Sequence, residues 1–174
     1  NGNMQYPDIA ARLIQMGRRD HTLRRLVLDE SKYESTLAKL DHLDTAHTQE
    51  LKAIVRDIGW PTNSKVGQKA AHAAWLLIQH ADKDIAFQKE CLALMKQQRP
   101  EEVERQHIAY LTDRIKLSEG KPQLYGTQFV RSPCNQSHWV PYTIQNPDNV
   151  ERRRKNMGLN SLEENQAELN SSFN

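Results

Sequence analysis

Apolar residues along the first two thirds of the chain recur at steps of three and four, the spacing of one face of an α-helix. This spacing predicts helices over about 7–27, 35–58, 66–80, 83–97 and 100–118. The stretch 70–78 is apolar on nearly every side, and such a helix is normally buried all round. We therefore expect the third helix to be the central one, with Trp75 in the core.

The pattern changes after Gly120. Residues 123–130 and 138–144 alternate and are rich in aromatic and β-branched side chains, which predicts a β-hairpin at about 123–144. A short helix is expected over about 148–157, and the polar tail 160–174 is expected to fray. The predicted fold is mainly α: a single helical domain, residues 1–159, of five to six helices with one C-terminal β-hairpin.

Polar residues interrupt the apolar stripes of the first two helices. Asp20 falls on the inward stripe of the first helix, with Arg24 one turn later, and a carboxylate on such a stripe is unusual. The alternative is an Asp20–Arg24 pair on the helix surface. Asp44 and His47 occupy the middle of the second stripe, on one face of the helix. The alternative there is a break, with Asp44 as the N-cap of a separate helix.

The central helix ends in a polar run, Gln79-His80-Ala81-Asp82. Burying polar groups is costly unless they are paired, so this end either reaches solvent or opens into a polar site. We expect Asp82 to cap the next helix. Asp113 and Arg114 lie near the inner edge of the fifth helix. These positions, on separate helices, point to a site where the stripes meet.

Size and charge narrow the classes of partner. The chain has 174 residues, enough for one domain with a real core, and a net charge of +2 from dispersed basic residues. We therefore expect no nucleic-acid partner and no membrane association. Cys91 and Cys134 lack metal-site spacing and fit reduced thiols, with a single disulfide as the alternative. Two locations stay open: cytoplasmic, which is slightly favoured, and secreted after removal of a leader that would have preceded Asn1.

Short motifs extend over most of the chain as an ordered set. They are Gly59-Trp60-Pro61, Val66-Gly67, Ala70-Ala71, Gln79-His80-Ala81-Asp82, Asp113-Arg114, Gln123-x-Tyr125-Gly126-Thr127-Gln128, Arg152-Arg153 and Gly158-Leu159. Together they resemble a bacterial family catalogued as a domain of unknown function, family 6624. Its pattern also has an acidic residue and an arginine in the first helix, which Asp20 and Arg24 match. It has an aspartate followed three residues later by a polar residue, more often Asn than the His47 found here after Asp44. The resemblance implies a shared fold and site and names no reaction.

The first functional hypothesis is an enzyme, a hydrolase or transferase. His80 would be the general base or acid, because an imidazole titrates near neutrality, and Asp44 or Asp113 would orient it. Arginines in the same pocket suit a small anionic substrate. The predicted substrate-binding residues are Asp20, Arg24, Arg114, Gln123, Tyr125, Thr127, Gln128 and Arg153.

Two alternatives stay open. The sequence requires no cofactor, but His47, His80 and Asp44 could hold a divalent metal, since imidazole and carboxylate ligands suit zinc, iron or manganese. The chain could also be a non-enzymatic module, immunity-like or effector-associated, that binds a small molecule, a peptide or another protein. The polar positions would then form a buried network that fixes helix register. The sequence does not indicate an oligomeric state.

Overall fold

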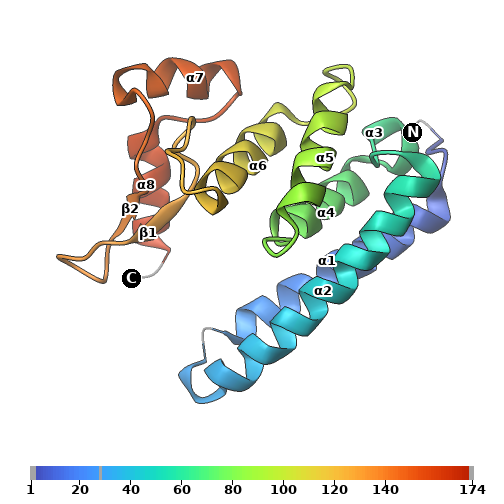
Figure 1. Ribbon diagram of the computed structural model, residues 1–174, viewed down its shortest axis with the longest axis horizontal. Helices are drawn as coiled ribbons and strands as arrows, with labels where there is room; N and C mark the ends of the chain where they lie inside the picture. The colour runs from blue at the N-terminus through green and yellow to red at the C-terminus, as the bar shows by residue number, and fades with distance from the viewer. Residues whose placement is uncertain (1–2, 28, 173–174) are drawn as a thin grey trace. The chain divides into compact units, whose positions relative to one another are not determined.

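The computed structural model describes residues 3–27 and 29–172 (Figure 1). Over these residues the protein is mainly α, with eight α-helices and a two-stranded antiparallel hairpin. This confirms the predicted fold class, although the helices are more numerous than expected. The chain divides into two compact units, one ending at Val103 and the other beginning at Glu104. The single domain expected over residues 1–159 stays a prediction.

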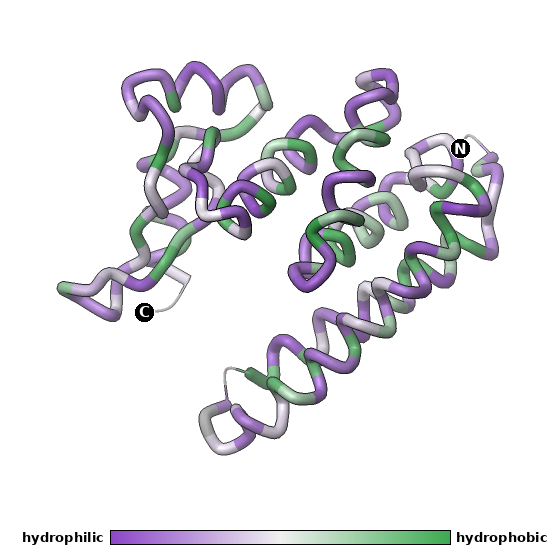
Figure 2. Tube along the Cα trace, in the orientation of Figure 1, coloured by the Kyte–Doolittle hydropathy of each residue, from purple (hydrophilic) through white to green (hydrophobic). Residues whose placement is uncertain are grey.

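The first unit consists of two long helices and three shorter ones. Its helices are α1 (Pro7–Leu26), α2 (Tyr33–Ile58), α3 (Asn63–Val66), α4 (Gln68–Gln79) and α5 (Ile85–Lys96), with a 3-10 turn at Glu30–Lys32. α1 packs against both α2 and α4. Figure 2 shows mostly hydrophobic colours along α4, whereas hydrophobic and polar residues alternate along α1 and α2. Core side chains such as Leu13, Leu51 and Ile78 are fully buried, as the stripes predict.

Several details of this unit correct the sequence-based expectations. α2 is continuous through Asp44, so a helix break there is wrong. Leu37, near the start of α2, is exposed although it is apolar, whereas Leu40 in the next turn is buried. The helix expected from Val66 is split, since Gly67 has a φ of 82° and separates α3 from α4. Trp75 is half-buried and not a core residue; its ring is tilted against that of His72.

The caps of the later helices also differ. Asp84, and not Asp82, caps α5, because its carboxylate accepts a 3.0 Å hydrogen bond from the Phe87 amide. The fifth predicted helix begins at Arg105 instead of Pro100. Cys91 is buried and Cys134 exposed, and both are free, so the disulfide alternative is wrong.

The second unit is built around a hairpin. It contains α6 (Arg105–Ser118), β1 (Phe129–Arg131), β2 (Trp139–Pro141), a 3-10 turn at Pro147–Asn149, α7 (Val150–Asn156) and α8 (Leu162–Ser171). In the hairpin, Val130 pairs with Val140. The first predicted strand is longer than the real one, because residues 123–128 form a loop whose backbone groups bond mainly to side chains.

Most of the polar tail forms helix α8 and does not fray as expected; residues 173 and 174 lie outside the described residues. Ser161 caps α8 by accepting a hydrogen bond from the Glu164 amide. Asn170 accepts a bond from the Trp139 amide at 2.7 Å, and Gln166 donates one to the Trp139 carbonyl at 2.9 Å. The packing of α8 against β2 could not be predicted from the sequence, because α8 contacts β2 through polar side chains and has no buried residue.

Candidate functional site

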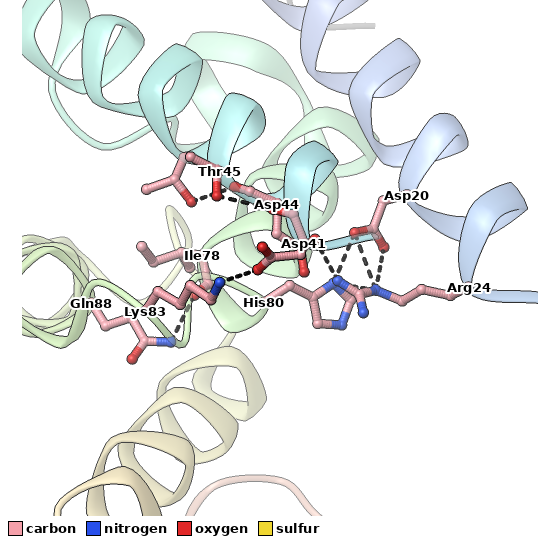
Figure 3. A network of polar contacts seen from close by, with 10 residues as sticks. Asp20, Arg24, Asp41, Asp44, Thr45, Ile78, His80, Lys83 and Gln88 are labelled. Atoms are coloured by element: carbon pink, nitrogen blue, oxygen red, sulfur yellow. Dashed lines mark hydrogen bonds and ion pairs between the residues drawn. The ribbon is translucent and has the colours of Figure 1, made fainter. Parts of the chain in front are cut away.

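Four predicted site residues of the first unit converge from three segments (Figure 3). Asp20 and Arg24 lie one turn apart on α1, Asp44 lies midway along α2, and His80 directly follows α4. Arg24 Nε donates to both carboxylate oxygens of Asp20, at 3.2 and 3.3 Å. Arg24 Nη2 donates to Asp44 Oδ1 at 2.6 Å. The Arg24 guanidinium therefore links α1 to α2 next to the His80 ring.

His80 uses one ring nitrogen in this network. Its Nδ1 lies 3.0 Å from Asp20 Oδ1 and 3.0 Å from Arg24 Nε. A protonated Nδ1 donates to the carboxylate, whereas an unprotonated one accepts from the guanidinium. The neutral ring therefore has a partner in either tautomer. The other nitrogen, Nε2, makes no hydrogen bond with any residue that the structure describes.

The two carboxylates differ in their protonation energetics. Asp20 is 1% exposed. Burial alone raises the pKa of its carboxyl, but the hydrogen bond and charge of His80, together with Arg24, hold the pKa below its ordinary value. For Asp44, burial prevails over the charge of Arg24, and the pKa of its carboxyl is raised. Asp20 is thus the carboxylate kept ionised beside the imidazole.

A cavity of about 370 Å³ lies beside His80, between α2 and the turn that leads from α4 to α5. Four carboxylates and one ammonium group line it, and two of these groups, Lys83 and Asp41, form an ion pair (Figure 3). Its lining residues are Asp41, Asp44, Thr45, Thr48, Gln49, His80, Ala81, Asp82, Lys83 and Asp84. Asp41 and Lys83 were not predicted as site residues, since both lie on exposed positions of the sequence pattern.

His47 lies one turn beyond Asp44 on α2 and is 3% exposed. Neither ring nitrogen has a hydrogen-bond partner within the described residues. Burial lowers the pKa of its imidazole, and this effect prevails over the negative charges of Asp20, Glu50 and Asp44, which act to raise the pKa. Within residues 3–27 and 29–172, no group of three or more His, Cys, Asp or Glu side chains is placed to hold a metal ion. The metal alternative with His47, His80 and Asp44 therefore gains no support from the geometry.

The remaining predicted residues belong to the second unit and surround the loop 123–128. Asp113 on α6 is fully buried and accepts hydrogen bonds from the amides of Leu124, Tyr125 and Thr127 at 2.8 to 3.2 Å. The Thr127 hydroxyl donates to the same carboxylate at 2.8 Å. Burial raises the pKa of Asp113, and the hydrogen bonds only partly offset this. Asp113 thus holds the backbone amides of one side of the loop.

The carbonyls of the loop are held by two arginines of α7. Arg153 Nε donates to the Leu124 carbonyl at 2.6 Å. Arg154 Nη1 donates to the carbonyls of Tyr125 and Gly126, at 2.9 and 3.1 Å. Sequence analysis missed Arg154, which is 1% exposed; its only signal was its place beside the Arg152-Arg153 motif.

The two glutamines close the ends of the loop. The Gln123 side chain donates to the Gln128 carbonyl at 3.0 Å and accepts from the Gln128 amide at 2.9 Å. Gln128 Oε1 accepts a bond from Arg114 at 3.2 Å, and Gln128 Nε2 donates to the Thr127 hydroxyl at 3.1 Å. The predicted residues of this unit therefore brace one loop.

A family model with the description "family of unknown function (DUF6624)" matches residues 7–174. The chain belongs to the DUF6624 family. No curated protein and no solved structure matches it. Within the described residues, no helix is long and apolar enough to cross a membrane.

The motifs of this DUF6624 protein thus sort into two sets. Asp20, Arg24, Asp44 and His80 form a network beside a cavity in the first unit. Asp113, Arg114, Gln123, Tyr125, Thr127, Gln128 and Arg153 gather at the loop of the second unit. A pocket shared by both sets stays a prediction.

Proposed function

We propose that this protein is an enzyme, a hydrolase or transferase, in which His80 exchanges a proton with a small substrate in the adjacent cavity. The observation that carries this proposal is the geometry of the imidazole. Its Nδ1 lies 3.0 Å from both Asp20 and Arg24, while Nε2 has no hydrogen-bond partner in the described part of the chain and belongs to a residue that lines the cavity.

The environment of His80 suits a general acid–base catalyst. With Nδ1–H donated to Asp20, the lone pair on Nε2 can accept a proton, and the buried carboxylate stabilises the imidazolium that forms. With Nδ1 accepting from Arg24, Nε2 carries the proton and can donate it. One ring can therefore serve as base and then as acid, which hydrolysis and group transfer both require.

The cavity favours a neutral or positively charged substrate over the anionic one expected from the sequence. Four carboxylates and one ammonium line it, and although Arg24 and Lys52 pair with Asp44 and Asp84, the carboxylates still outnumber these cations. Arg24 already bonds to Asp20 and Asp44, and Arg153 bonds to backbone carbonyls of its own unit. A volume of about 370 Å³ suits a small molecule, within the roughly 300–1,000 Å³ range of ligand pockets.

A non-enzymatic ligand-binding module is the second candidate. It is supported by the links that Arg24 makes from α1 to Asp44 on α2 and to His80 after α4, since such a network also fixes helix register. In that case the cavity would bind a ligand without turning it over.

The test compares wild type with His80→Asn and the matched control His42→Asn, a histidine exposed on α2 and absent from the cavity. Each protein is assayed against panels of neutral and cationic esters, amides, glycosides and acyl donors. We expect turnover by wild type and His42→Asn and a loss of at least about 100-fold in His80→Asn, the usual contribution of a general acid or base. Equal turnover by all three proteins would refute the role of His80.

Nuclear magnetic resonance of the imidazole nitrogens gives an independent readout. The Nδ1 and Nε2 shifts of His80 report its tautomer, and we expect them to change in Asp20→Asn. A ligand that shifts these resonances but is not turned over by wild type would favour the binding module.

A further inference from the structure

A second hollow of the first unit lies between α1 and α4 and shares no lining residue with the cavity beside His80. Its volume is about 430 Å³. α1 supplies Ile14, Gly17, Arg18, His21 and Thr22, and α4 supplies Lys69, His72, Ala73 and Leu76. We call this hollow the α1–α4 groove.

The rim of the α1–α4 groove is basic. Arg18, His21 and Lys69 are exposed, and none of them forms a hydrogen bond or ion pair with another described residue. None of the described residues that line the groove is an aspartate or a glutamate. By contrast, Arg12, Arg24 and Lys52 of the same unit each have a carboxylate partner. The rim therefore carries positive charge that the protein itself does not neutralise.

The floor of the α1–α4 groove is apolar. Ile14 and Leu76 are half-buried, and Ala73 is 6% exposed. Gly17 faces Ala73 so closely that an added Cβ would lie 3.1 Å from Ala73 Cβ. A partly exposed apolar floor below unpaired cations is complementary to a molecule with an anionic head and an apolar body.

We propose that the α1–α4 groove binds a small amphiphilic anion, a carboxylate or phosphate joined to a short alkyl or aryl body. Arg18 and Lys69 bind the anionic head from opposite helices, and Ile14 with Leu76 contacts the apolar body. The size of the groove favours a small ligand over a partner helix, which would need a longer surface. This proposal does not depend on the reaction proposed for His80.

The probe is octyl phosphate below its micelle concentration, titrated into the full chain by calorimetry. Inorganic phosphate supplies the head alone, and octyl glucoside supplies the same tail without charge. We expect octyl phosphate to bind at least ten times more tightly than either, with affinity that falls as salt rises. Equal binding of octyl glucoside, or binding only to anionic lipid vesicles, would overturn the proposal.

Variants locate the binding site. The double variant Arg18→Gln/Lys69→Gln should lose at least tenfold in affinity for octyl phosphate. Its matched control, Lys39→Gln/Lys96→Gln, removes two exposed charges that lie outside the groove, on α2 and α5. It should bind as wild type does. All four side chains are exposed, so both variants should fold, and circular dichroism checks this. Equal losses in both double variants would show that net charge alone drives binding and would overturn the site.

Discussion

Arg154 Nη1 donates a 2.9 Å hydrogen bond to the carbonyl of Tyr125, and this arginine is 1% exposed. The same guanidinium reaches the carbonyls of Gly126 and Asn160, the latter at 2.7 Å. A fully buried charge is costly unless it is hydrogen-bonded, and here one side chain joins α7 to the loop 123–128 and to the start of α8. Arg154 is therefore a structural centre of the second unit.

Replacing Arg154 should destabilise the protein strongly. Arg154→Met leaves several buried carbonyls without donors, each costing about 1–3 kcal/mol, so we expect a loss of at least 3 kcal/mol in denaturant melts. Arg154→Lys should rescue little, because an ammonium cannot reproduce the planar fork. The control Arg152→Met alters an exposed neighbour and should stay within about 0.5 kcal/mol. A loss below about 1 kcal/mol for Arg154→Met would contradict this role.

Alanine substitutions at two glycines with similar backbone angles distinguish the cost of backbone strain from the cost of a steric clash. Gly126 has a φ of 64° and Gly120 a φ of 71°. An alanine at either site pays about 1–2 kcal/mol for the left-handed conformation. At Gly126 an added Cβ would also lie 2.9 Å from Leu162 Cδ1, whereas at Gly120 nothing lies within 4 Å.

We therefore expect Gly126→Ala to cost more than Gly120→Ala by about 1–3 kcal/mol, the usual penalty of overpacking. The two melts are measured side by side in urea. Equal losses of stability in the two variants would mean that Leu162 on α8 moves away from the extra methyl group at no cost, which would contradict this prediction.

The sequence predicted the inner face of α1 well. Its stripe placed Asp20 inward, and the side chain is buried and paired with Arg24. A single helix face is a local property, set by spacing along one segment. The surface-pair alternative for Asp20 is accordingly wrong, because its carboxylate is 1% exposed and also reaches His80.

The conformation of the loop 123–128 could not be predicted in the same way. Alternation suggested a strand, but Asp113, Arg153 and Arg154 satisfy its backbone groups from two other helices. Such bonds depend on where α6 and α7 pack, which no periodicity encodes. The docking of α8 escaped prediction for the same reason, since Asn170 and Gln166 carry it.

His47 offers a test of a buried group without partners. Neither of its nitrogens bonds to a described residue, so an apolar residue of similar size should be tolerated. We expect His47→Leu to be neutral or to stabilise by about 1 kcal/mol at pH 7. The exposed His42→Leu is the control and should change stability by less than about 0.5 kcal/mol. A loss above about 2 kcal/mol in His47→Leu would show that the ring holds an essential partner.

The same residue predicts a pH dependence. Burial lowers the pKa of His47, so below about pH 6.5, the ordinary value, the unfolded chain binds a proton more readily than the folded one. Wild type should therefore lose stability as pH falls from 6.5, and His47→Leu should lose less. Parallel pH profiles for the two proteins would contradict the buried, neutral imidazole.

Asp20 and Asp44 should respond differently to the same substitution, because the pKa values of their carboxyls are shifted in opposite directions. The pKa of Asp20 is lowered, so its ionised form stabilises the fold above about pH 3.9, the ordinary value, and this stability is lost as pH falls through the lowered pKa. Asp20→Asn should therefore cost about 1–3 kcal/mol at pH 7, since Arg24 and His80 each lose a charged acceptor.

The pKa of Asp44 is raised, so the fold disfavours its ionised form, and an amide that mimics the neutral acid should be tolerated. We expect the free energy of unfolding of Asp44→Asn to stay within about 0.5 kcal/mol of wild type at pH 7, although Arg24 is then left with Asp20 as its one carboxylate partner among the described residues. Urea melts at pH 7, 5 and 3.5 compare the three proteins. The penalty of Asp20→Asn should shrink at pH 3.5, because the wild-type unfolded chain is by then largely protonated at this position. Equal penalties for the two variants would contradict the assignment of Asp20 as the ionised partner of His80. That result would also count against the proposed proton transfer, which requires an ionised carboxylate at Asp20.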